Sequence, residues 1–139
     1  MTDINAWNSQ LIDRFRSHAG WVGGNFDGIP LLILHTVGAR SGLARENPLV
    51  FQRSGRSFVV FASAGGADRS PDWYANLLAR RRAVVEVGDR LIEVTPRVAT
   101  GEEREELWRG LVRAIPAFAL QQQRATSRAI PVVVLEPSS

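Results

Sequence analysis

Two pairs of short apolar segments, each joined by a two-residue turn, restrict the fold of this chain more than any other feature. The segments are 48–53 and 57–63 around Ser54-Gly55, and 83–87 and 91–98 around Gly88-Asp89. A two-residue connection joins antiparallel strands, whereas parallel strands need a long crossover. We therefore expect an antiparallel sheet or small barrel with peripheral helices, that is, an α+β chain that is mainly β.

Two further apolar runs complete about six strands. Residues 31–37 lie between Pro30 and Gly38, and residues 130–135 form a last strand near the C-terminus. The chain has 139 residues, and about 100 to 200 residues per domain is the usual expectation. We therefore predict one domain over 1–139, with the barrel and its helices at 30–137.

Three or four helices are expected around these strands. Ile4, Trp7, Leu11 and Phe15 recur at helical spacing and predict an amphipathic helix over 1–19. The other helix signals are Ser70 as N-cap with Pro71 at the first helical position, a capping box from Thr100 to Glu103, and a short polar helix or loop after Pro116.

The chain contains no cysteine and no lysine, so all 17 basic residues are arginine. A thiolate nucleophile, a disulfide framework and a Schiff-base lysine are thereby excluded. His18 and His35 are too few for a three-histidine zinc site, and we expect no metal. Without a secretory signal or a long apolar run we expect a cytoplasmic protein, and a peripheral membrane association through Trp7, Phe15 and Trp21 is the alternative.

The positive charge is concentrated in the middle of the chain. Residues 38–82 carry eight arginines and three acidic residues, a net charge of +5, whereas the flanking segments are each at −1. A local excess of this kind indicates an anionic partner, either a phosphorylated small molecule or a nucleic acid backbone. The alternative is a solvated basic face without a partner.

The turn at 38–45 is the first candidate site. Gly38 and Gly42 can take positive φ and expose consecutive backbone N–H groups, while Arg40, Ser41 and Arg45 add donors around the same point. This combination is typical of an anion-binding nest, although a plain hairpin loop would also use glycine.

A second candidate is the loop Ala62-Ser63-Ala64-Gly65-Gly66, which precedes a helix start. Its glycines allow close approach of a ligand, but it has neither a dinucleotide fingerprint nor the first glycine of a nucleophile elbow. On the helix behind it, Trp73 either packs in the core or stacks on a cofactor, and Asn76 faces the same ligand or solvent. His35, inside an apolar strand, is expected to be a satisfied core histidine.

Five segments taken together resemble the deazaflavin-dependent nitroreductase family. They are 32–42, 45–49 (which includes Pro48), 62–66, 71–77 and 128–135, in that order and spacing. The resemblance covers about residues 25–137. It implies a split β-barrel like that of the flavin-binding reductases, and coenzyme F420, in its reduced form, as hydride donor. FMN is the alternative cofactor.

The resemblance also implies roles for individual residues. The coenzyme carries a phosphodiester and a polyglutamate tail, which would account for the +5 segment better than a nucleic acid does. The loop at 38–45 would hold the phosphate and tail, the loop at 62–66 would line the ring, and Ser63 would polarise the ring or substrate. Pro48 and Asn76 would also bind the coenzyme. Trp73 would border the ring or its substrate side, and Phe118 would border the substrate. Relatives carry a second basic residue at the position of Ala39, and a lysine or another polar residue at that of Ala64.

The implied activity is hydride transfer from reduced F420 to a planar, electron-poor small molecule such as a quinone or a nitroaromatic compound. The segment after Pro116 lacks the tyrosines of relatives that reduce nitroimidazoles, so quinones are the preferred expectation. The alternative is a flavin- or deazaflavin-binding or carrier protein on the same fold that does not catalyse turnover. Monomer and homodimer both remain open.

Overall fold

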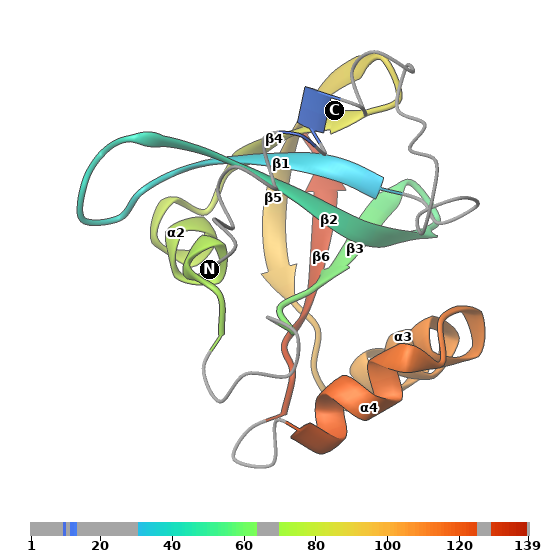
Figure 1. Ribbon diagram of the computed structural model, residues 1–139. Helices are drawn as coiled ribbons and strands as arrows, with labels where there is room; N and C mark the ends of the chain where they lie inside the picture. The colour runs from blue at the N-terminus through green and yellow to red at the C-terminus, as the bar shows by residue number, and fades with distance from the viewer. Residues whose placement is uncertain (1–9, 11, 14–30, 64–69, 125–128, 139) are drawn as a thin grey trace.

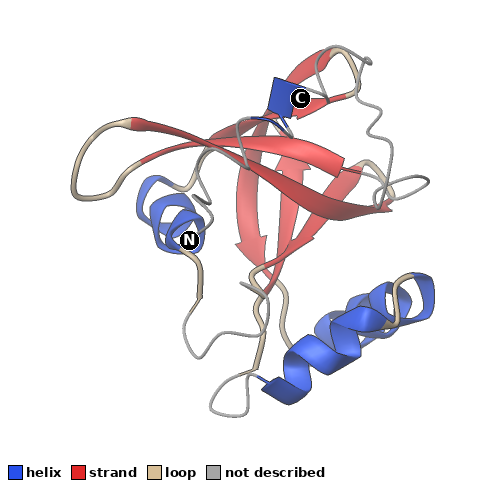
Figure 2. Cartoon of the chain, in the orientation of Figure 1, coloured by secondary structure: helices blue, strands red, loops and turns tan. Residues whose placement is uncertain are grey.

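The computed structural model describes residues 10, 12–13, 31–63, 70–124 and 129–138 (Figure 1). Six strands form a closed antiparallel barrel in the order β1-β2-β3-β6-β5-β4. Their bounds are β1 Leu31–Val37, β2 Ala44–Ser54, β3 Ser57–Phe61, β4 Ala83–Val87, β5 Arg90–Val98 and β6 Val132–Pro137. The mainly β barrel with peripheral helices is therefore confirmed, and Figure 2 shows the helices outside the strands.

Both predicted hairpins are present. Ser54 pairs with Ser57, and Val87 pairs with Arg90, with Gly55 and Gly88 at positive φ in the two turns. The strand β2 begins at Ala44, four residues before the predicted start at Pro48, because residues 44–47 continue the pairing with β1. The last strand runs over 132–137 in place of 130–135 and lies between β3 and β5.

Side chains alternate between the inside and the outside of the barrel. Leu32 and Leu34 of β1 belong to the interior cluster, whereas Leu31 and Ile33 pack on the outer face with Ile12 and Val50. Ile12 comes from the predicted N-terminal helix and is 5% exposed, so at this position the helix packs on protein. Most of that helix, including Trp7, Phe15 and Trp21, lies outside the described residues.

Helix α2, Asp72–Arg80, closes one side of the barrel interior. Trp73 and Leu77 are buried in the interior cluster. The predicted cap is wrong by one residue: Pro71, with extended backbone, is the N-cap, and no side-chain bond caps the helix. Proline cannot donate a backbone hydrogen bond and its φ is preset, so it suits the position where the chain enters the helix.

Helices α3, Gly101–Ala114, and α4, Ala117–Arg124, cover the outer face of β3 and β6 (Figure 1). Thr100 is the N-cap of α3 as predicted, but its side chain makes no capping bond. The Glu103 carboxylate does not reach back to it, because Arg97 donates to Glu103 at 2.5 and 3.0 Å. This hydrogen bond lowers the pKa of Glu103 and fastens the start of α3 to β5.

Arg81, which follows α2, lies in the left-handed region with φ 57°. A non-glycine residue pays a steric cost there that glycine avoids. We expect Arg81→Gly to stabilise the protein by about 0.5–1 kcal/mol and to raise Tm by about 2–4 °C in thermal unfolding. Arg80→Gly, one residue earlier and inside the helix, should instead destabilise the protein by about the same amount. A loss of stability in Arg81→Gly would contradict this account.

Candidate functional site

The end of the β1–β2 hairpin extends past the barrel above α2 (Figure 1). The strand register pairs Leu32 with Leu49, Leu34 with Asn47, and Thr36 with Arg45, so each pair shares one face. Because Leu32 and Leu34 point into the barrel, the same face continues outward as Asn47, Thr36 and Arg45. The inner face therefore changes from apolar to polar toward the turn.

Thr36 marks this change. Thr36 is only 6% exposed, and its Oγ1 has no hydrogen-bond partner among the described residues. A buried hydroxyl without a partner is costly, and such groups are usually satisfied by protein, water or a ligand. Thr36 therefore fits a site that receives a polar group from outside the chain.

The turn itself differs from the predicted nest. Gly42 has φ 70°, but Gly38 does not take positive φ. Three N–H groups of the turn are used internally: Gly38 donates to Leu43 O at 2.8 Å, Gly42 donates to Gly38 O at 2.9 Å, and Leu43 donates to Ser41 Oγ at 3.2 Å. The prediction of two positive-φ glycines is therefore wrong, and these bonds stiffen the turn.

Two guanidinium groups remain available around this turn. Arg40 and Arg45 are exposed, and neither has an ion pair with any carboxylate in the described part of the chain. Glu46 follows Arg45 directly, but successive residues of a strand point to opposite faces. Arg45 therefore places a positive charge on the inner face of the hairpin, and Arg40 adds a second one at its turn, as an anion site requires.

Glu46 lies instead near His35 on the outer face. His35 Nε2 is 3.1 Å from Glu86 Oε1, and His35 Nδ1 is 3.7 Å from Glu46 Oε1. His35 is thus satisfied as predicted, although it is half-buried on the outside and is not part of the core. In the described residues no group of three or more His, Cys, Asp or Glu could hold a metal ion.

Asn76 is buried and bound to the hairpin. Its Oδ1 accepts the Ala39 N–H at 2.9 Å, and the residue is 9% exposed. The expectation that Asn76 faces a ligand or solvent is therefore wrong for this oxygen. Trp73, three residues earlier, is 5% exposed and makes an edge-to-face contact with Tyr74, so most of its ring is core.

Only part of the glycine loop is described. Ala62 is fully buried and donates to Pro131 O, while the Ser63 N–H donates to Phe61 O. Ala64, Gly65 and Gly66 lie outside the described residues. Pro48 pairs with Ile33 on the outer face of the hairpin, so the structure does not bring it together with Arg45.

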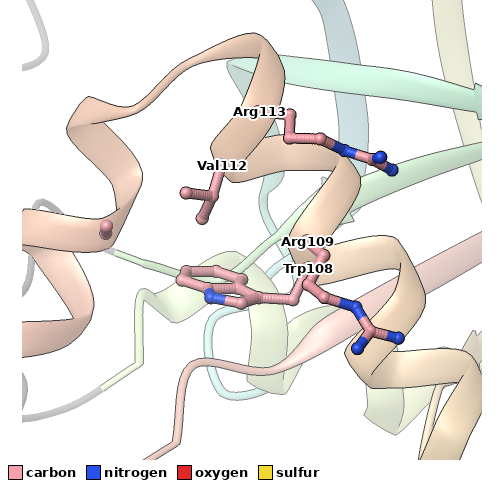
Figure 3. A pocket seen from close by; sticks show the side chains of 5 residues that line it. Trp108, Arg109, Val112 and Arg113 are labelled. Carbon is pink, nitrogen blue, oxygen red and sulfur yellow. The ribbon is translucent and has the colours of Figure 1, made fainter.

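Phe118 is placed apart from Trp73. It is the buried residue of α4, with its ring centroid 6.2 Å from that of Phe61, and it belongs to a cluster separate from the one that holds Trp73. A hollow of about 410 Å³ lies on the α3–α4 layer; it is lined by Trp108, Arg109, Val112, Arg113 and Ala119 (Figure 3). The structure therefore gives no common wall made of Trp73 and Phe118.

Thr36 and Asn47 are the residues that the sequence reading missed. The signal was available in the period-two pattern, because Thr36 follows Leu32 and Leu34 on one face, and Asn47 and Arg45 follow Leu49 and Phe51. Without the register between the strands, this pattern could not show that the residues of β1 and those of β2 share one face.

No helix in the described residues has the length and apolar character needed to cross a bilayer.

Gly38 is required for close packing of the turn. A Cβ at this position would lie well inside van der Waals distance of Ser41 Oγ. We expect Gly38→Ala to displace the Ser41 hydroxyl from the Leu43 N–H. The free energy of unfolding, measured in urea, should fall by about 1 kcal/mol, which is the usual net value of one hydrogen bond. Adding Ser41→Ala removes the obstructing atom, so Gly38→Ala should then cost less than it does in the wild-type background. Equal costs in both backgrounds would show that the contact does not matter.

Comparison with known proteins identifies relatives of this chain. The family model described as F420H2-dependent quinone reductase matches residues 7–137. An F420H2-dependent quinone reductase of Mycobacterium tuberculosis is 35% identical over 124 residues, which cover 87% of this chain and 83% of the relative.

Solved structures agree with this result. The structure of an F420H2-dependent reductase is 37% identical, with a TM-score of 0.70, and the match covers 77% of this chain and 94% of that one. A structure described as a domain-swapped dimer is 31% identical, with a TM-score of 0.72, and the match covers 96% of this chain and all of the other.

Proposed function

This chain belongs to the family of F420H2-dependent quinone reductases, and on that premise we propose that it binds the coenzyme between the inner face of the β1–β2 hairpin and helix α2. The protein is an oxidoreductase whose hydride donor is reduced F420 and whose acceptors are quinones. When bound, the coenzyme supplies the hydride, so the chain needs no covalent nucleophile of its own.

The observation that carries this placement is the pair of exposed guanidinium groups at the end of the hairpin, one on its inner face and one in its turn. Arg40 and Arg45 have no described carboxylate partner, and the coenzyme carries a phosphodiester and a polyglutamate tail. Charge-assisted hydrogen bonds from arginine to phosphate or carboxylate are stronger than neutral ones and are often bidentate. The two side chains therefore fit the anionic part of F420.

Other residues of the site fit the remaining needs of the reaction. Thr36 offers an unused hydroxyl to a polar group of the coenzyme, and Ala62 closes the apolar interior beside the predicted ring site. We assign Ser63 the polar contact that stabilises developing negative charge on the ring or the acceptor. Trp73, as part of the packed wall, excludes water from this side of the site.

Binding and turnover together test the proposal. We expect titration with F420 to quench tryptophan fluorescence with a Kd in the micromolar range, and we expect oxidation of F420H2 when menadione is added. Because exposed arginines are screened by salt, raising NaCl from 50 to 500 mM should weaken binding several-fold. No binding at tens of micromolar would contradict the proposal. Tight binding without turnover over a quinone panel would favour a carrier role, and tighter binding of FMN than of F420 would favour the alternative cofactor.

The oligomeric state and the cellular location of the protein can also be tested. A relative that is a domain-swapped dimer makes a homodimer the form to test against a monomer, by light scattering after gel filtration. The partner is a small-molecule acceptor, and we propose a cytoplasmic location with peripheral membrane contact as the alternative. Co-sedimentation with anionic vesicles distinguishes these two.

A further inference from the structure

The hairpin end that carries Arg40 and Arg45 has little support from the sheet. β1 pairs with β4 only over residues 33–35, and β2 pairs with β3 only over residues 51–54. From Thr36 to Asn47 the hairpin is therefore a ribbon of two strands. A two-stranded ribbon is marginally stable in water, so its turn would sample many positions if nothing held it.

Asn76 provides a point of attachment for this ribbon. Its Oδ1 accepts the N–H of Ala39, which immediately precedes Arg40, at 2.9 Å. Asn76 is buried on the same side of α2 as Trp73 and Leu77, which pack in the barrel interior, so its own position is well fixed. Burying an amide is costly unless it is bonded, and an apolar residue would suit the rest of this face better.

We propose that Asn76 is a positioning residue for the coenzyme: through the Ala39 N–H it holds the turn so that Arg40 and Arg45 are aligned before the anionic groups arrive. This inference rests on the proposed function. Through this bond Asn76 acts on the turn that carries the two arginines. A turn that is already held loses less conformational entropy on binding, and the affinity for the coenzyme is therefore higher.

The two ends of the hydrogen bond can be removed separately. Asn76→Ala removes the acceptor, and Ala39→Pro removes the donor while placing proline just after the first residue of the turn, a position that it tolerates well. Each change should raise the Kd for F420 about 5- to 10-fold, in line with the net value of one hydrogen bond. The double variant should bind no more weakly than either single variant, because both remove the same interaction.

Gln52→Ala is the matched control. Gln52 also joins a side chain to a distant backbone, since its Nε2 donates to Gly110 O at 3.1 Å, but it links β2 to α3 away from the hairpin end. We expect its loss to lower Tm without changing the Kd for F420. In steady-state assays Asn76→Ala should raise KM for F420H2 about 5- to 10-fold and leave kcat within about twofold, because an aligned coenzyme reacts normally once bound.

Amide exchange provides a readout that needs no coenzyme. In the free protein the Ala39 amide should exchange at least about tenfold faster in Asn76→Ala than in wild type, and Asn76→Asp, which keeps an acceptor oxygen, should restore slow exchange. Multiplicative effects of Asn76→Ala and Ala39→Pro on Kd, a fall in kcat at unchanged KM, or unchanged exchange at Ala39 would each overturn the inference. Failure of the wild-type protein to bind F420 would instead refute the proposed function, and the exchange result would still decide whether the turn is held.

Discussion

Arg45→Glu should weaken the binding of F420 by about 100-fold or more, while the fold remains intact. A hydrogen bond to a charged group contributes about 1.5–3 kcal/mol, which corresponds to about 10- to 100-fold, and a carboxylate at this position adds repulsion of the anionic coenzyme. Arg45 is exposed and has no ion pair among the described residues, so its loss should not destabilise the barrel. Isothermal titration at fixed ionic strength measures the change in affinity.

Arg113→Glu provides a control with the same change in net charge. Arg113 is exposed on α3, which packs on the outer face of the barrel far from the hairpin end (Figure 1). If the long-range field of the protein dominated, both variants would lose affinity equally. A loss confined to Arg45→Glu supports a local contact, and equal Kd values for Arg45→Glu and wild type would show that the anionic groups bind elsewhere.

Phe61→Ala should be the most damaging change to stability, at about 3–5 kcal/mol, which is the usual cost of deleting a buried aromatic ring. Phe61 is 6% exposed, and its ring lies 6.2 Å from both Trp108 and Phe118. It joins α3 and α4 to the barrel, so its removal leaves a cavity that the surrounding strands cannot close. Urea unfolding followed by circular dichroism measures this loss.

Leu120→Ala on α4 is the comparison. Leu120 is 55% exposed, so removing its apolar side chain beyond Cβ should change stability by no more than about 0.5 kcal/mol. Because Phe61 lies in the cluster away from Trp73, the residual folded fraction of Phe61→Ala should retain wild-type Kd for F420. A small loss of stability in Phe61→Ala would mean that α3 and α4 are not held to the barrel through this ring.

The candidate site was only partly readable along the chain. The turn residues Arg40, Ser41 and Arg45 were found because glycine and arginine cluster within eight positions. The burial of Thr36 and the bond between Ala39 and Asn76 are not predictable from the sequence, because burial depends on the whole fold and the bond joins residues 37 positions apart. Phe118 was assigned to the substrate side by resemblance, whereas the packing places it with Phe61.

The sequence by itself determined the local features of this protein. Ser54-Gly55 and Gly88-Asp89 each set a hairpin because the turn conformation depends on adjacent residues. The +5 charge of 38–82 and the absence of cysteine and lysine likewise restricted the chemistry before any fold was known. The tertiary structure alone decided the insertion of β6 between β3 and β5, the meeting of Thr36 with Arg45 on one face, and the attachment of Ala39 to Asn76. These contacts depend on strand register and on the closure of the barrel. Both arise from packing across the whole chain, so no short segment of the sequence predicts them.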